Sequence, residues 1–364
     1  MPPQACGGAC HSFDTGHTIK SIAPGGRTRV EVGFFFWPYD TALIRSMAEA
    51  ADAFGYDMVG IADTPGNAMD PWVATTLLAA AARRARVAVC VTNLVTRHPA
   101  VSAASAASIE LLAPGRVVLG IGVGHSGTKN LGMASLPAGQ LGEGVTFIRE
   151  LLRGRAATYR GGTAHLPWVK HPSPVFLAAS HPASLRAAGA AADGAFINYG
   201  LGADNVRESE GAVAQAASEA GRRPDDVEIW QIAGMDCNED GDAARRKIGA
   251  ILAFVAAYVV GGGDPARRGV PPEHREPLRE LRRRYSTRPS DADAALVAEL
   301  GLFDYLARRL AVCGTPEECL AQVRAAQEAG VRRLMFSVSL AIDPVRAVRL
   351  FGEKVLPALR TRLA

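Results

Sequence analysis

The sequence has few cysteines, no long apolar run and almost no excess of either charge. Six cysteines scattered over 364 residues cannot make a disulfide framework, so we expect a cytoplasmic protein in a reducing compartment. The longest apolar stretch, residues 248–260, falls short of the roughly 18 residues of a membrane span. The first residues also lack the apolar core of a signal peptide. We therefore expect no membrane partner.

The charge balance argues against a nucleic-acid partner. The formal net charge is +4, from 40 basic and 36 acidic residues, and the arginines are spread along the chain rather than gathered in one patch. Residues 1–28 are small, polar and glycine-rich, which predicts a flexible extension. Cys6, Cys10 and His11 lack a second ligand pair at zinc-site spacing, so we favour a plain tail over a metal site and expect no metal.

From Val30 onward, short β-rich runs alternate with longer runs of helical periodicity. Length alone would suggest two domains, but an α/β barrel is longer than a typical domain and still forms a single one. We expect an α/β protein with a TIM (β/α)8 barrel in one domain over residues 29–364. Its eight strands are expected at residues 30–36, 58–63, 87–93, 116–124, 174–180, 194–200, 227–237 and 332–340.

Several residues mark where helices should begin and end. Asp70 and Thr315 each stand directly before a proline and are expected to cap a helix at its first residue. Gly55 follows an apolar-periodic run and is expected to stop a helix.

The interval between the seventh and eighth strands is about 95 residues, far longer than one crossover needs. Two amphipathic helices are expected, at residues 241–260 and 291–310, separated by a Pro- and Arg-rich insertion at residues 261–290. The insertion fits a solvated surface segment, a lid or a dimer element.

Gly122, Gly124 and Gly127 spell G-x-G-x-x-G after a β-branched run, which is the dinucleotide-binding fingerprint. That fingerprint must open a helix at once, whereas residues 128–142 contain several Gly and Pro residues. We therefore interpret these glycines as the end of the fourth barrel strand, where they leave room for a flat ligand.

Hydrogen-bonding and small residues stand at the ends of six expected strands. Each one alone could cap a helix or close a turn. Six sets on one rim favour a ligand site at the carboxyl face of the barrel. The sets are 36–37, 63–64, 92–93, 124–126, 179–181 and 198–199.

Four blocks of the chain resemble the bacterial luciferase-like flavin and deazaflavin oxidoreductases, above all the methylenetetrahydromethanopterin reductase type. They are "VTNLVTRHPAVSAASAASIELLAPGRVVLGIGVGHSGTKNLGM" (91–133), "GVTFIRELLRG" (144–154), "VFLAASHPASLRAAGAAADGAFIN" (175–198) and "VCGTPEECLAQVRAAQEAGVRRLMF" (312–336). The resemblance implies a luciferase-like barrel with an insertion between strands 7 and 8. It also implies reduced coenzyme F420, a deazaflavin, or FMN at the carboxyl rim, and a homodimer formed through the early helices.

The resemblance also implies roles for the residues at the strand ends. A non-prolyl cis peptide is expected at Thr92–Asn93 or Asn93–Leu94, and His125 and Asp63 are the candidates for moving a proton. The substrate is expected to meet Phe35, Trp37, Thr64 and Tyr199. The cofactor is expected to contact Asp63, Thr92, Asn93, Leu94, Gly124, His125, Ser126, Ala179, Ser180 and Asn198.

The chain departs from the reductase pattern at several positions. "GFFF" (33–36) occupies the place of a glutamate in the first strand, and His125 replaces an acid after the fourth. His181–Pro182 stands where the reductases have "GP", and Leu94 occupies a position where the reductases commonly have proline. The loss of two acids argues against a pterin and favours an apolar or natural-product substrate. His125 then either donates a proton or hydrogen-bonds the cofactor.

Three functions fit these patterns. The leading one is hydride transfer between reduced coenzyme F420 and a small organic substrate. The alternatives are an FMN-dependent monooxygenase and a cofactor-binding barrel without catalysis. The small residues at 102–108 would allow close helix approach in a dimer, although packing on the barrel strands is their more common use.

Overall fold

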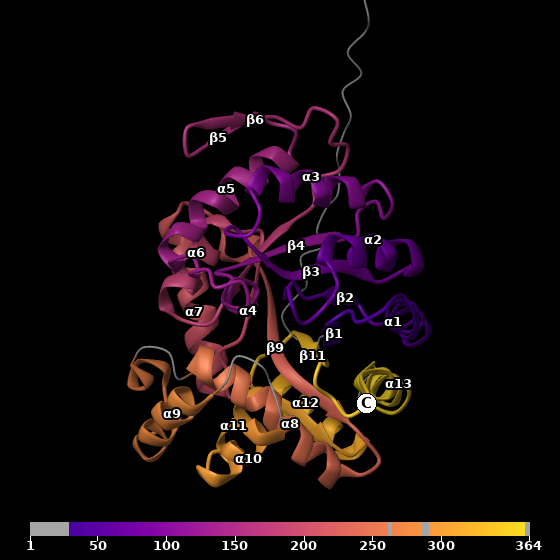
Figure 1. Ribbon diagram of the computed structural model, residues 1–364, viewed down its shortest axis with the longest axis vertical. Coiled ribbons are helices and arrows are strands. Elements are labelled where there is room, and N and C mark those ends of the chain that lie inside the picture. The colour runs from indigo at the N-terminus through magenta and orange to yellow at the C-terminus, as the bar shows by residue number, and fades with distance from the viewer. Residues whose placement is uncertain (1–28, 261–263, 286–290, 361–364) are drawn as a thin grey trace, which may run out of the picture.

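Eight parallel strands close into a barrel in the computed structural model, which describes residues 29–260, 264–285 and 291–360. Pairing runs from β9 through β11, β1, β2, β3, β4 and β7 to β8, and β8 pairs with β9 to close the ring (Figure 1). The strands are β1 (Glu31–Phe36), β2 (Met58–Ile61), β3 (Arg86–Asn93), β4 (Val117–Gly122), β7 (Val175–Ala179), β8 (Gly194–Ile197), β9 (Glu228–Cys237) and β11 (Arg333–Ser337). The predicted TIM barrel is confirmed.

Helices cover the outside of the barrel. They are α1 (Thr41–Phe54), α2 (Pro71–Ala81), α3 (Pro99–Glu110), α5 (Leu141–Leu152), α6 (Pro182–Ala191), α7 (Ala203–Glu219), α12 (Pro316–Glu328), α13 (Pro344–Lys354) and α14 (Leu356–Arg360). The expected end signals are confirmed: the Asp70 carboxylate accepts from the backbone N–H groups of residues 72 and 73, and Thr315 caps α12. Gly55 ends α1 at a φ of 69°, which favours glycine.

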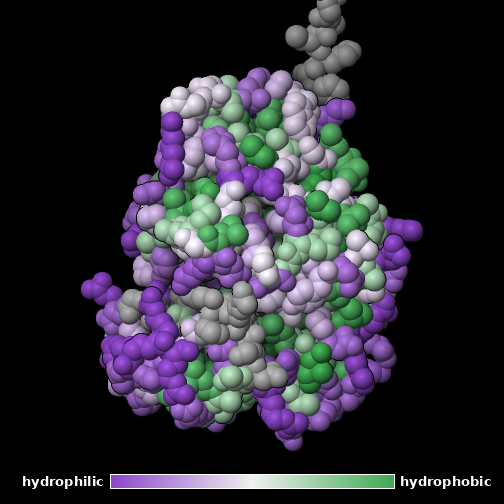
Figure 2. Space-filling view, viewed as in Figure 1, coloured by the Kyte–Doolittle hydropathy of each residue, from purple (hydrophilic) through white to green (hydrophobic). Residues whose placement is uncertain are grey.

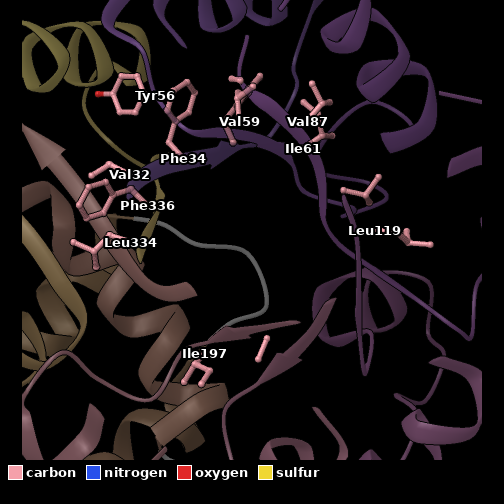
Figure 3. Close-up of a cluster of buried hydrophobic side chains, with 14 of the residues drawn as sticks. Val32, Phe34, Tyr56, Val59, Ile61, Val87, Leu119, Ile197, Leu334 and Phe336 are labelled. Atoms are coloured by element: carbon pink, nitrogen blue, oxygen red, sulfur yellow. The ribbon is translucent and has the colours of Figure 1, made fainter. Parts of the chain in front are cut away.

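Two apolar layers follow from the alternation of side chains along each strand. On β1, Phe34 and Phe36 are buried among the side chains between barrel and helices. Figure 3 shows Phe34 beside Tyr56 in this layer. Phe35 points the other way and packs with the barrel interior, which contains Met58, Phe176, Phe196, Trp230 and Met335. The run "GFFF" thus serves both layers.

Strand β3 contains one extra residue relative to β4. Val89 pairs with Leu119 and Thr92 pairs with Ile121, so the register shifts between them. A cis peptide bond joins Cys90 to Val91 inside this bulge. The expected position at Thr92–Asn93 or Asn93–Leu94 was therefore wrong by two or three residues, because the irregularity lies within the strand rather than at its end.

The segment between β9 and β11 forms a helical unit at one end of the molecule (Figure 1). It contains α8 (Gly241–Val255) with a π-helical extension η3 (Ala256–Val260), then η4 (Pro265–Arg268), α9 (Pro272–Arg284), α10 (Asp291–Glu299) and α11 (Phe303–Leu310). A separate apolar core holds these helices together. The helix expected at residues 291–310 is broken at residues 300–302, and α9 was missed.

Strand β10 (Ala311–Gly314) follows α11 and pairs with the second half of β9. A small hairpin, β5 (Ala157–Tyr159) and β6 (Gly162–Ala164), lies at the opposite end of the molecule (Figure 1). Neither β10 nor this hairpin was expected from the sequence. Within the described ranges, no helix combines the length and the apolar character needed to cross a membrane.

Candidate cofactor and substrate site

A cavity of about 200 Å³ opens at the carboxyl ends of the barrel strands. Most of the residues expected there do line it, which brings six strand ends together. They are Phe35, Trp37, Asp63, Thr64, Thr92, Asn93, Gly124, His125, Ser126, Ala179, Ser180 and Asn198.

Leu94 and Tyr199, two of the expected site residues, lie away from this cavity. The side chain of Leu94 packs against Gly144 of α5, and the Tyr199 hydroxyl donates to Glu208 of α7 at 2.7 Å. Each follows a residue that does line the cavity but lies in a bend past the strand end, where the turn sets the direction of the side chain. Both therefore face the helices.

Several apolar residues of the lining were not expected from the sequence. Phe254 of α8 and Val259 of η3 reach the cavity from the insertion side. Nothing in their local sequence distinguishes them from ordinary core residues of an amphipathic helix. The barrel-interior residues were hidden for the same reason, and they are Cys90, Val91, Phe196 and Ile232.

Asp63, two residues past β2, and Thr92 of β3 form a partly buried hydrogen-bonded pair. The Thr92 hydroxyl donates to the Asp63 carboxylate at 2.6 Å. Burial raises the pKa of Asp63, the Thr92 bond partly offsets that rise, and the charges of Asp70 and Arg97 act in opposite directions. Asp63 is thus a carboxyl group that takes up a proton more readily than an exposed one.

Asn93 uses its side-chain oxygen to close a turn. Asn93 Oδ1 accepts from the backbone N–H groups of Val95 and Thr96, both at 2.9 Å. This is the turn-closing role that the sequence left open for Asn93. The residue shapes the wall of the cavity, and its oxygen is already occupied.

The glycines at the end of β4 serve close packing. A Cβ on Gly124, whose φ is 91°, would lie 2.6 Å from Thr128 Cγ2, and a Cβ on Gly122 would lie 2.9 Å from Val91 Cγ2. Both are closer than real side chains approach. The glycines therefore let β4 and the start of α4 pack closely against β3, and both also line the cavity. That they leave room for a flat ligand stays a prediction.

A short helix, α4 (His125–Lys129), begins directly after Gly124. No helix was expected directly after Gly124, and this expectation was wrong. The conclusion against a dinucleotide turn stands on other grounds, because β4 belongs to a closed parallel barrel rather than to an open doubly wound sheet.

His125 is the first residue of α4 and faces a positively charged neighbourhood. Burial, together with smaller effects of the charges of Lys129 and His181, lowers its pKa to about 4. The pKa of His181, at the end of β7, is lowered by burial and by Arg268. His125 is consequently neutral at pH 7, which suits a hydrogen-bonding partner or a proton acceptor better than an acid.

Asn198 carries an unused acceptor inside the cavity. Its Oδ1 atom is buried and has no hydrogen-bond partner among the described residues. Buried polar atoms in folded proteins are almost always paired, so an unpaired oxygen in a cavity indicates a place for a ligand N–H or O–H group. The described residues contain no cluster of His, Cys, Asp or Glu side chains suited to a metal ion, and Cys6, Cys10 and His11 lie outside them.

The chain matches the family described as luciferase-like monooxygenase over residues 37–333. It is 27% identical over 339 residues to a 5,10-methylenetetrahydromethanopterin reductase of Methanolobus tindarius, covering 89% of this chain and 99% of that protein. It is also 27% identical over 340 residues to an F420-dependent glucose-6-phosphate dehydrogenase of Microbacterium testaceum, covering 86% and 92%.

The fold agrees with a solved relative. The coenzyme F420 dependent tetrahydromethanopterin reductase from Methanopyrus kandleri superposes with a TM-score of 0.75 at 22% identity, covering 92% of this chain and 100% of that one. The predicted resemblance to this branch is thus confirmed for both sequence and fold.

Proposed function

The chain belongs to the luciferase-like monooxygenase family, and from that premise we propose that it transfers a hydride between coenzyme F420 and a small organic substrate. The observation that carries this proposal is the unpaired Asn198 Oδ1 atom in a cavity at the carboxyl rim. An F420-dependent dehydrogenase among the relatives supports the choice of cofactor.

The residues at the rim fit a flat, partly polar cofactor. Apolar side chains from the barrel interior form one part of the cavity, and Asn198 offers an acceptor to a ring N–H group. Ser126 and Ser180 line the same cavity, and their hydroxyls can bind polar groups on the side chain of the cofactor. When bound, F420 supplies or accepts the hydride.

His125 is the candidate for the accompanying proton. At pH 7 its neutral imidazole can accept the proton of a substrate hydroxyl while the hydride leaves the carbon that bears this hydroxyl. In the reverse direction the same group must first take up a proton. Asp63, whose pKa is raised by burial, is the second candidate.

The family description also supports a monooxygenase as the alternative, which we expect to use FMN. The third candidate, a cofactor-binding barrel without catalysis, is an outcome of the same experiment. Trp37 lines the cavity, so binding of reduced F420 or FMN can be followed by tryptophan fluorescence. We expect F420 to bind, whereas tight binding of FMN alone would overturn the proposal.

A matched pair of variants tests the carrying observation. Asn198→Ala removes the unpaired acceptor and should weaken F420 binding roughly tenfold. Asn238→Ala removes an amide outside the cavity, where its Oδ1 accepts from the Asp240 N–H, and should leave binding unchanged. Equal affinity of both variants would remove Asn198 from the site.

His125→Gln should slow turnover of a substrate while F420 still binds. Binding of F420 with no turnover of any acceptor would favour the non-catalytic barrel.

We also propose a homodimer in the cytoplasm, formed through α2 and α3. Large apolar side chains are exposed on this face, and the hydrophobic colour gathers where these helices lie, in the upper right of Figure 2. They include Val73, Leu77, Val101, Leu111 and Leu112. Leu77→Asp should convert a dimer to a monomer in light scattering, and a wild-type monomer would contradict the proposal.

A further inference from the structure

Arg268 is the last residue of η4, at the edge of the insertion, and it carries an unused hydrogen-bond donor. Its Nη1 atom is buried and has no hydrogen-bond partner among the described residues. A guanidinium has five donors in a planar fork that matches carboxylate and phosphate groups. An unpaired buried donor on a charged group is costly, so it marks a place where a ligand can contribute what the protein does not.

The backbone of Arg268 is fixed against the barrel by Arg309. Arg309 is only 6% exposed, and its Nη2 donates to the Arg268 carbonyl at 2.6 Å. The Nε of Arg309 donates to the Tyr199 carbonyl, just after β8, at 3.1 Å. One buried side chain thus ties the η4 turn to the end of a barrel strand beside Asn198.

The charge of Arg268 acts on ionisable side chains that follow three barrel strands. It lowers the pKa of His125 after β4 and of His181 after β7, and it interacts with Tyr199 after β8. His125 and His181 both line the cavity. The bonds of Arg309 place the η4 turn beside Tyr199, the residue that follows Asn198 of the cavity lining. Lys129 and Arg282 add further positive charge at His125.

We propose that Arg268 binds an anionic group, a carboxylate or a phosphate, of the substrate that enters the cavity. The inference rests on the function proposed above and specifies its substrate class. The apolar lining accommodates an uncharged body, and the anionic group stays at the mouth, where Arg268 and the neighbouring cations neutralise it. The sequence favoured an apolar or natural-product substrate, and a substrate without an anionic group leaves the Arg268 donor unpaired.

The test uses the whole protein and inorganic phosphate as the probe. Phosphate is titrated into wild-type protein saturated with F420, and into protein without F420, with tryptophan fluorescence and calorimetry as readouts. Arg268→Gln should weaken phosphate binding by roughly tenfold or more, and Arg268→Lys should keep part of it. Arg267→Gln is the matched control, because Arg267 is the exposed neighbour on the same turn.

The outcomes separate the possible sources of the anion. Phosphate binding that is unchanged in Arg268→Gln, or absent in the wild type, overturns the proposal. The anionic tail of F420 would be the occupant if bound F420 blocks phosphate, and if Arg268→Gln weakens F420 but not the deazaflavin core that lacks the tail. That result also overturns the substrate assignment.

Two controls keep the inference separate from the function on which it rests. Thermal unfolding of each variant checks that a loss of phosphate binding is not a loss of fold. Failure of F420 to bind the wild type would sink the proposed function, while the titration without F420 would still report on Arg268.

Discussion

The two sides of the cavity are built in different ways. On the side of β2 to β4, Asn93 bonds to residues two and three positions ahead, and Asp63 bonds to Thr92 on the neighbouring strand. On the insertion side, Arg309 bonds to carbonyl groups 110 and 41 residues away along the chain. The first side is shaped by local turn chemistry and strand pairing, and the second depends on one buried cation.

The largest effect is expected from Arg309→Ala. The variant removes the donors to Tyr199, Arg268 and the Tyr305 hydroxyl and leaves buried carbonyls unpaired. We expect a loss of about 3 kcal/mol in the free energy of unfolding, measured with urea. Arg308→Ala, at the exposed neighbouring position, should change it little. Equal losses would show that the insertion does not depend on the buried cation.

Gly124→Ala should have the next largest effect, on the opposite side of the cavity. The added Cβ would lie 2.6 Å from Thr128 Cγ2 at a φ of 91°, so we expect a loss of about 2–3 kcal/mol. Gly132 also has a positive φ, 69°, but nothing lies within 4 Å of its Cβ position. Gly132→Ala should therefore cost only about 1 kcal/mol, and a loss as large as that of Gly124→Ala would refute the packing argument.

Thr92→Val should cost about 1 kcal/mol at pH 7 by removing the bond to Asp63. Burial raises the pKa of Asp63 in the folded state, so protonation favours folding and this group's contribution falls as pH rises through that pKa. The Thr92 bond lowers the same pKa, so its loss should hurt more at pH 7 than at a pH where Asp63 is protonated.

Thr75→Val is the control for this pH dependence. Its hydroxyl is also buried but donates to a backbone carbonyl, that of Pro71, at 2.6 Å. Its cost, measured by urea unfolding across the same pH range, should not vary with pH. If the loss in the free energy of unfolding varied with pH in the same way for both variants, the pH dependence could not be assigned to Asp63.

The smallest effect is expected on the surface of the insertion. Arg284 and Glu299 join α9 to α10 through an ion pair at 2.7 Å, and both side chains are exposed. Solvent screens such pairs, so Arg284→Ala should produce no measurable change in the urea midpoint. A marked loss would mean that the insertion relies on surface charge as well as on Arg309.

The sequence predicted the barrel side of the molecule well because its signals are local. The strands alternate with helices whose ends are marked by Asp70, Thr315 and Gly55, and these signals need no knowledge of distant residues. Residues at strand ends also predicted about half of the cavity wall, since parallel strands of a barrel end on one rim.

The rest depends on contacts that periodicity cannot reveal. Phe254 and Val259 look like core residues of α8 and η3, and only the path of the chain brings them to the cavity. Arg309 lies in an arginine pair where sequence alone does not tell the buried member from the exposed one. Leu94 and Tyr199 were misplaced because the direction of a side chain past the strand end depends on the turn.

Strand β10 gives the insertion a narrow base. Gly314 pairs with Cys237, and the Asn238 N–H donates to the Gly314 carbonyl at 3.0 Å, so the segment leaves and rejoins the barrel at neighbouring positions. Adjacent strands lie about 4.8 Å apart, and a chain that exchanges the intervening helices has to bridge only that gap. The helical unit between Cys237 and Gly314 therefore begins and ends within one strand spacing, a geometry that allows its length to change without displacing the eight-stranded wall.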